Sequence, residues 1–190
     1  MRRLFIIRKD LHLTPGKLAA MVGHCCEAYW TNLMKSGRVH DNEFVSLPAV
    51  ETFPNGEKGP ALYMHPKLYE LSKKAFESGA DAFICEAEDS RKSVTVSFEI
   101  PKDIWDGYVN GIFTKTICEA RNKNHLLKAE TIAKELHLEE GKDYGFINDK
   151  CLTELAPENE DGTTTVGMWF APLEDETAHK ISKKFPLYRD

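Results

Sequence analysis

The sequence contains no apolar run that approaches the roughly 20 residues a bilayer-spanning helix needs. The apolar stretch near its start, Leu4–Ile7, is also too short for the apolar core of a secretory signal peptide. We therefore expect no membrane partner and a cytoplasmic protein.

The sequence has few cysteines, and their spacing matches no paired-cysteine motif. The five cysteines form no CxxC pair, which argues against a zinc site and against a disulfide framework. The histidines and carboxylates show no convincing ligand spacing either. Gly16-Lys17 lacks the upstream glycine of a Walker A loop. We expect no metal, no cofactor and a reducing environment.

The chain has fewer Lys and Arg than Asp and Glu, but the positive residues are concentrated near the N-terminus. A net charge of −5 argues against a generic nucleic-acid binder. Residues 1–38 nevertheless hold seven Lys and Arg against two Asp and Glu. This end of the chain is a candidate surface for a polyanion, and chance clustering in a short segment is the alternative.

The alternation of short β-rich runs with amphipathic segments predicts an α/β fold. The length of 190 residues suits one domain, or one domain with an elaboration. Residues 39–64 carry prolines and glycines and are expected to be irregular. We predict a three-layer-type sandwich, with helices on both faces of a mixed, mostly parallel sheet. The expected strands are 4–7, 82–85, 93–100, 112–119, 144–147 and 163–170, and the expected helices are 15–36, 66–78, 124–138 and 175–184.

The front segment carries the first candidate site. Thr14 is a suitable N-cap and Pro15 suits the first helical position. Lys17 then opposes the helix dipole, so it is either a solvated lysine or part of an anion site with the free helix N–H groups. His24 follows two turns later on the same side, where an ordinary structural histidine is the alternative. The helix at 124–138 is expected to bury Leu127, Ile132, Ala133 and Leu136.

Three blocks resemble one family. GKLAAMVGHCCEAY is similar to the GK-x-AAQ-x-SHA-x-x-x-Y signature of the archaeal and eukaryotic-type (type II) peptidyl-tRNA hydrolases. INDKCLTELAP resembles that family's D-A-G-R-T-Q-I-x-P loop, and DGTTTVGMWFAPL resembles its G-S-x-T-V-L-x-I-G-P strand. The blocks occur in the family's order and cover residues 3–38 and about 110–190. The resemblance implies a single domain over 1–190 with an insertion at about 40–108.

The resemblance also implies a reaction, the hydrolysis of the ester that joins a peptide to the 3′ ribose of tRNA. Lys17 would offer charge to the oxyanion or to a phosphate, and Asp149 would orient or deprotonate water or fix Lys17. Thr153 and Thr165 would position water or ester, and His24 would orient its neighbours. The implied catalytic residues are Lys17, Asp149, Thr153, Thr165 and His24, with Thr163 as a neighbouring hydroxyl. Arg8 and Lys9, from the positive N-terminal region, join Thr163 as the expected substrate-binding residues.

The loop departs from the family at two positions. Leu152 stands in place of the family's arginine and Glu154 in place of its glutamine, so a phosphate-binding cation is lost and a negative charge is added. Two functions stay open: a hydrolase of peptidyl-tRNA, and a catalytically degenerate module that binds RNA or a protein partner. Two interpretations of the insertion also stay open: a structural cap or homodimer contact, and an element that reshapes the substrate cleft.

Overall fold

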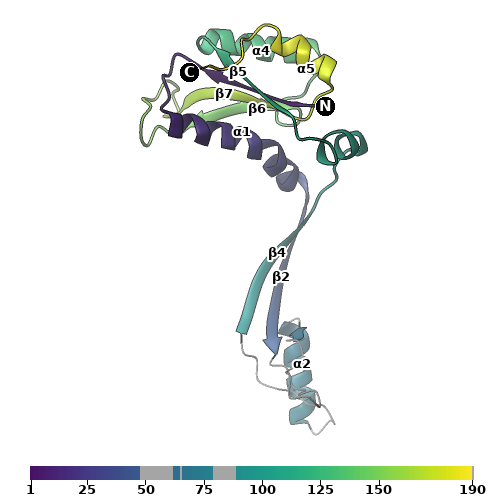
Figure 1. Cartoon of the computed structure of the whole chain (residues 1–190). Coiled ribbons are helices and arrows are strands. Elements are labelled where there is room, and N and C mark those ends of the chain that lie inside the picture. The colour runs from purple at the N-terminus through teal and green to yellow at the C-terminus, as the bar shows by residue number, and fades with distance from the viewer. Residues whose placement is uncertain (48–61, 65, 79–88, 190) are drawn as a thin grey trace, which may run out of the picture. The chain divides into compact units, whose positions relative to one another are not determined.

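The chain folds into two compact units. The computed structural model describes residues 1–47, 62–64, 66–78 and 89–189 (Figure 1). One unit comprises Met1–Gly37 and Phe98–Asp190, and the other comprises Arg38–Ser97. Residues 98–108, which the sequence analysis grouped with the insertion, therefore belong to the first unit.

The first unit is built on a four-stranded sheet in the order β5-β1-β7-β6. Its strands are β1 (Arg3–Arg8), β5 (Lys115–Ala120), β6 (Tyr144–Asp149) and β7 (Thr164–Phe170). The sheet is mixed, as predicted. The expectation of a mostly parallel sheet is wrong, because only β1 and β5 are parallel and β7 runs antiparallel to both β1 and β6.

Strand β1 is buried on both faces, and its alternating side chains enter two separate cores. Leu4 and Ile6 pack in the core that also contains residues of α4 (Lys123–Glu135) and α5 (Asp175–Ser182). Phe5 and Ile7 pack in the core formed with α1 (Pro15–Ser36). Figure 1 shows α1 on one side of this sheet and α4 with α5 on the other. The two-residue period of a strand thus places the helices.

The helices begin where the sequence supplies caps. Thr14 accepts a hydrogen bond from the Lys17 N–H with Pro15 at the first helical position, and Asn122 accepts from the His125 N–H at the start of α4. The predicted inward face of α4 is confirmed for Ala133, which is buried, and for Ile132 and Leu136, which pack against the core. It is wrong for Leu127, which is 38% exposed, and Leu126 and Ala129 are buried instead. Among the residues described, no helix is both long and apolar enough to cross a membrane.

Two further segments complete the first unit. The chain near its C-terminus pairs with the outer edge of β5, where Leu187 bridges Cys118 and Tyr188 N–H donates to Ile117 O. Covering an edge in this way removes unpaired backbone groups from solvent. Residues 98–114 contain the short helix α3 (Lys102–Ile104) and the π-helical turn η1 (Trp105–Val109).

The second unit contains β2 (Arg38–Leu47), β3 (Leu62–Met64), α2 (Pro66–Glu77) and β4 (Asp89–Ser97). Strand β2 pairs antiparallel with both β3 and β4, in the order β3-β2-β4. The prediction that residues 39–64 are irregular is therefore wrong for 39–47 and 62–64. The strand predicted at 82–85 lies outside the described residues.

Two glycines give opposite predictions for stability. A Cβ at Gly167 would lie 2.6 Å from the Ile6 carbonyl oxygen and 2.8 Å from Ile7 Cδ1, whereas a Cβ at Gly23 in α1 meets nothing within 4 Å. We expect Gly167→Ala to lower the free energy of unfolding by about 1–3 kcal/mol. Gly23→Ala should raise it by about 0.5–1 kcal/mol through helix propensity. Urea unfolding measures both, and equal midpoints for the two variants would contradict this packing.

Candidate active site

The central contact of the candidate site joins Lys17 to Asp149. Lys17 lies in the first turn of α1 and Asp149 is the last residue of β6, yet Lys17 Nζ approaches Asp149 Oδ2 to 2.6 Å. The same ammonium donates to Thr153 Oγ1 at 3.4 Å. The side chains of Lys17 and Asp149 are only 14% and 9% exposed. Three of the residues expected to act together therefore lie together.

Asp149 is held on both of its oxygens. Its Oδ1 accepts the backbone N–H of Cys151 at 2.8 Å, closing a small loop in which Cys151 adopts a left-handed φ of 54°. Burial by itself raises the pKa of the Asp149 carboxyl, but the hydrogen bond from Lys17, the Cys151 N–H and the Lys17 charge outweigh it and lower the pKa. A carboxylate with a lowered pKa is a weak general base at neutral pH, so the geometry favours Asp149 as the group that fixes Lys17.

Lys17 keeps a donor for a ligand. An ammonium group has three N–H bonds, and the described residues accept two of them, at Asp149 and Thr153. Thr153 is exposed and uses its oxygen as an acceptor from Lys17, which leaves its own O–H to donate elsewhere. The pair therefore presents one charged N–H and one hydroxyl proton at an accessible edge.

Glu154 anchors the loop that carries Thr153. Thr14 Oγ1 donates to Glu154 Oε1 at 2.7 Å, and the Thr14 N–H points to Glu154 Oε2 at 3.5 Å. Thr14 is also the N-cap of α1, and a carboxylate is favourable near a helix N-terminus. The sequence suggested that Glu154 would repel an RNA backbone. In the structure its charge instead faces the helix start, where the sequence analysis placed an external anion.

His24 lies two turns beyond Lys17 and is exposed. Its charge is the smallest of the influences that lower the pKa of Asp149. No hydrogen bond joins it to Lys17 or Asp149 in the described part of the chain. His24 thus lies near the pair without contacting it.

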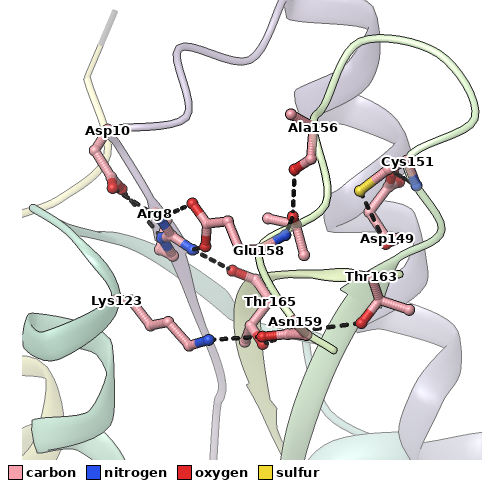
Figure 2. Close-up of polar contacts among 11 residues, drawn as sticks. Arg8, Asp10, Lys123, Asp149, Cys151, Ala156, Glu158, Asn159, Thr163 and Thr165 are labelled. Atoms are coloured by element: carbon pink, nitrogen blue, oxygen red, sulfur yellow. Dashed lines mark hydrogen bonds and ion pairs between the residues drawn. The ribbon is translucent and has the colours of Figure 1, made fainter. Parts of the chain in front are cut away.

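Thr165 lies on the other face of the sheet. Asp149 pairs with Thr164 and Asn148 pairs with Thr165, so the alternation of side chains directs Thr165 away from Asp149. Its Oγ1 accepts from Asn159 Nδ2 at 3.3 Å, and Asn159 Oδ1 in turn accepts from Lys123 Nζ (Figure 2). The expectation that Thr165 acts beside Lys17 therefore has no contact to support it.

Thr163 belongs to the same turn as Asn159. Its hydroxyl donates to Asp161 Oδ1 at 2.6 Å and accepts from Asn159 Nδ2 at 3.0 Å. Both contacts are local, across two and four residues, and they shape the turn that enters β7. We find a structural role for Thr163 and no contact with the Lys17–Asp149 pair.

Arg8 is a buried structural cation. Its five N–H donors are all engaged, by both oxygens of Asp10, both oxygens of Glu158 and the carbonyl of Thr165 (Figure 2). Its side chain is only 3% exposed, and the hydrogen bond with Glu158 is the main reason that its pKa is raised. The expectation that Arg8 binds substrate phosphate does not fit this geometry.

Lys9 is likewise engaged by the protein. Its ammonium donates to the carbonyl of Arg189, lies 3.7 Å from Glu119 Oε2 and sits 4.4 Å from the centre of the Tyr188 ring. These contacts tie the C-terminal segment to the sheet edge. A substrate contact by Lys9 would have to compete with them.

In the described part of the chain, no three His, Cys, Asp or Glu side chains cluster as the ligands of a metal ion would. Cys151 is half-buried and its Sγ contacts the Asp149 carbonyl oxygen at 3.5 Å. Burial raises the pKa of Cys25 to about 12, which makes that thiol inert. The side chains that the described residues bring into contact at this site are those of Lys17, Asp149 and Thr153.

Sequence reasoning missed two members of the site, Thr14 as a loop anchor and the Cys151 N–H. Thr14 was recognised only as a helix cap, and its contact with Glu154 spans 140 residues, which no local pattern reports. Comparison with protein-family models and with curated proteins gives no match to this chain. The functional argument therefore rests on the site geometry and on the motif resemblance.

The lowered pKa of Asp149 predicts a pH-dependent contribution to stability. Because the folded protein favours the ionised carboxyl, this contribution is present above the ordinary aspartate value of about 3.9 and is lost as the pH falls through the lower folded value. Asp149→Asn should reduce the free energy of unfolding by about 1–3 kcal/mol at pH 7, and by progressively less below about pH 4.

Urea unfolding at pH 7 and pH 3 measures this difference. Lys17→Met provides the matched control, because without the ammonium the effect of Asp149→Asn should shrink at pH 7. A difference between wild type and Asp149→Asn that is the same at both pH values would show that the pair does not stabilise the fold.

Proposed function

We propose that this protein hydrolyses the ester bond of peptidyl-tRNA, or of a related N-blocked aminoacyl-tRNA, and so returns free tRNA. The observation that carries the proposal is the Lys17–Asp149–Thr153 contact, since three residues from two separate motif blocks meet at one partly open position. We extend the proposal to the architecture and take α1, the sheet and the pair α4 and α5 as the three-layer sandwich of that family.

The proposed reaction uses water as the nucleophile. The water oxygen adds to the ester carbonyl carbon, and the carbonyl oxygen becomes an oxyanion that the remaining Lys17 N–H stabilises. The Thr153 hydroxyl orients the water or the ester. The bond between the carbonyl carbon and the ribose 3′ oxygen then breaks, and the proton from water ends on that oxygen. A preorganised charged donor of this kind is typically the largest single contribution to such a reaction.

Asp149 has a supporting role in this proposal. Its carboxylate pairs with the Lys17 ammonium and fixes its direction, while the Cys151 N–H fixes the carboxylate. Glu154 extends the same support by holding the loop against Thr14. A stabilising donor is effective when its position needs no rearrangement during the reaction, and these contacts supply that rigidity.

A non-catalytic module that binds RNA or a protein partner is the second candidate, and one observation favours it. Leu152, at the position of the family's arginine, is 83% exposed at the loop surface beside the site. An exposed leucine cannot hold a phosphate, whereas it suits contact with an apolar partner. Hydrolysis assays separate the two candidates.

The enzymatic proposal predicts that Lys17→Ala and Asp149→Asn each lower the rate of N-acetyl-aminoacyl-tRNA hydrolysis by about 10²–10³-fold. His24→Ala should cost less, because His24 makes no contact with the pair. Lys35→Ala, at the last turn of the same helix, is the matched control and should leave the rate unchanged. Equal turnover in wild type and all four variants, with unchanged circular dichroism, would reject the site.

The loop departure gives a separate prediction. Leu152→Arg combined with Glu154→Gln should tighten tRNA binding by about 1–3 kcal/mol, because arginine offers a fork of donors to phosphate. Glutamine keeps an oxygen that can accept from Thr14, so the loop should stay anchored. Fluorescence anisotropy measures the affinity, and Leu152→Gln with Glu154→Gln is the control. If the variant with Leu152→Arg and Glu154→Gln binds tRNA no better than this control, the loop does not face RNA.

A further inference from the structure

A cavity of about 420 Å³ lies between α4 and the turn that follows α5, on the face of the sheet opposite α1. Its lining comprises His125, Lys128, Thr131, Ile132 and Lys184. The volume falls within the range of roughly 300–1,000 Å³ that is usual for small-ligand sites. Four of the five side chains are polar or charged, and none of them is acidic. The lining is therefore suited to an anion.

Two ammonium groups share this cavity without a counter-ion. Among the described residues, neither Lys128 nor Lys184 is within salt-bridge distance of a carboxylate. Two other lysines, one on α4 and one on α5, are different: Lys134 Nζ lies 2.5 Å from Glu130 Oε1, and Lys180 Nζ lies 2.9 Å from Glu176 Oε1. Lys134 and Lys180, outside the cavity, thus have a carboxylate partner, whereas Lys128 and Lys184 have none among the described residues.

His125 forms a rigid wall of the cavity. Its ring stacks on Phe185 with centroids 4.6 Å apart, and its Nδ1 accepts the Arg121 backbone N–H at 3.1 Å. Desolvation lowers the pKa of His125, and the nearby charges of Arg121 and Lys128 lower it further against an opposing hydrogen bond with the Lys184 backbone. The imidazole is therefore a neutral brace between α4 and the end of α5, in a locally positive environment.

We propose that the cavity between α4 and the turn that follows α5 binds a phosphate group, which the ammonium groups of Lys128 and Lys184 hold, one from each segment. Lysine binds phosphate as a point charge. Two lysine charges suit the charge of a phosphate better than they suit the single charge of a carboxylate. The Thr131 hydroxyl now donates to its own helix at Leu127 O, and it can rotate its proton toward the ligand.

The position of α4 relates this cavity to the Lys17 site. Strands β1 and β5 are adjacent and parallel, and α1 and α4 follow their carboxyl ends. Both helices therefore begin at the same edge of the sheet, on opposite faces. An RNA that reaches Lys17 at this edge could place a backbone phosphate in the cavity. If the phosphate belongs to an RNA, the inference rests on the proposed function. If it belongs to a free phosphorylated molecule, the inference stands without that function.

The test compares two double variants. Lys128→Ala with Lys184→Ala removes the two cations of the cavity, and Lys134→Ala with Lys180→Ala removes two lysines on α4 and α5 that are paired with carboxylates. Inorganic phosphate is titrated at constant ionic strength while the His125 ring signals are followed by NMR. Deacylated tRNA is titrated by fluorescence anisotropy at two salt concentrations. Thermal unfolding checks that both variants remain folded.

We expect phosphate to shift the His125 signals in wild type and in the Lys134/Lys180 variant, and to leave them unshifted in the Lys128/Lys184 variant. If the source is RNA, tRNA affinity falls about tenfold in the Lys128/Lys184 variant only, and its salt dependence drops by about two contacts. If tRNA binding is unchanged while the phosphate response is lost, the source is a free phosphorylated molecule. No phosphate response in wild type, or an equal loss in both variants, overturns the proposal.

The phosphate titration also separates this proposal from the proposed function. Lys17→Ala should abolish hydrolysis and leave the phosphate response of His125 intact. A protein that hydrolyses N-acetyl-aminoacyl-tRNA but shows no phosphate response would retain the proposed function and lose only the cavity site.

Discussion

The first unit depends on the need of β1 to bury both of its faces. Its apolar side chains alternate between two cores, so α1 must cover one face while α4 and α5 cover the other. Burial of this kind stabilises by about 1.5–3 kcal/mol for each large apolar side chain. The covering of β1 by α1 also fixes the start of α1 near the end of β6. The Lys17–Asp149 contact therefore follows from the core, and the loop from 150 to 163 adds the groups that complete it.

Each end of β1 carries a buried arginine whose charge is compensated by hydrogen-bond acceptors or carboxylates. Arg3 is only 1% exposed and donates to the carbonyls of Cys25, Cys26 and Phe170, and no carboxylate of the described residues pairs with it. Desolvation lowers its pKa, as expected for a buried cation. Arg8, at the other end, has two carboxylates. The two arginines hold α1 and the Glu158 loop respectively. Much of the positive charge that the sequence concentrates in residues 1–38 is thus engaged by hydrogen bonds and ion pairs within the protein.

Local sequence signals predicted the parts of the structure that local forces decide. The strand at 4–7, the cap at Thr14 and the helix starting at Pro15 follow from composition and capping, and the motif order brought Lys17 and Asp149 together. The predictions that were wrong depend on which face of a helix or strand a residue occupies, or on contacts between segments far apart in the sequence. One residue of register separates Leu126 from Leu127, and one position in β7 separates Thr164, opposite Asp149, from Thr165. The contacts of Glu154 with Thr14 and of Glu158 with Arg8 join segments whose proximity only the folded chain defines.

The central claim is that the Lys17–Asp149–Thr153 contact supports ester hydrolysis on tRNA. The most direct measurement is a single-turnover assay in which purified wild-type protein, in excess, meets N-acetyl-aminoacyl-tRNA labelled in its acyl group. We predict release of the N-acetyl amino acid far faster than spontaneous hydrolysis, with the tRNA left intact. Release at the spontaneous rate by a folded protein that still binds the tRNA would contradict the claim and favour a binding module.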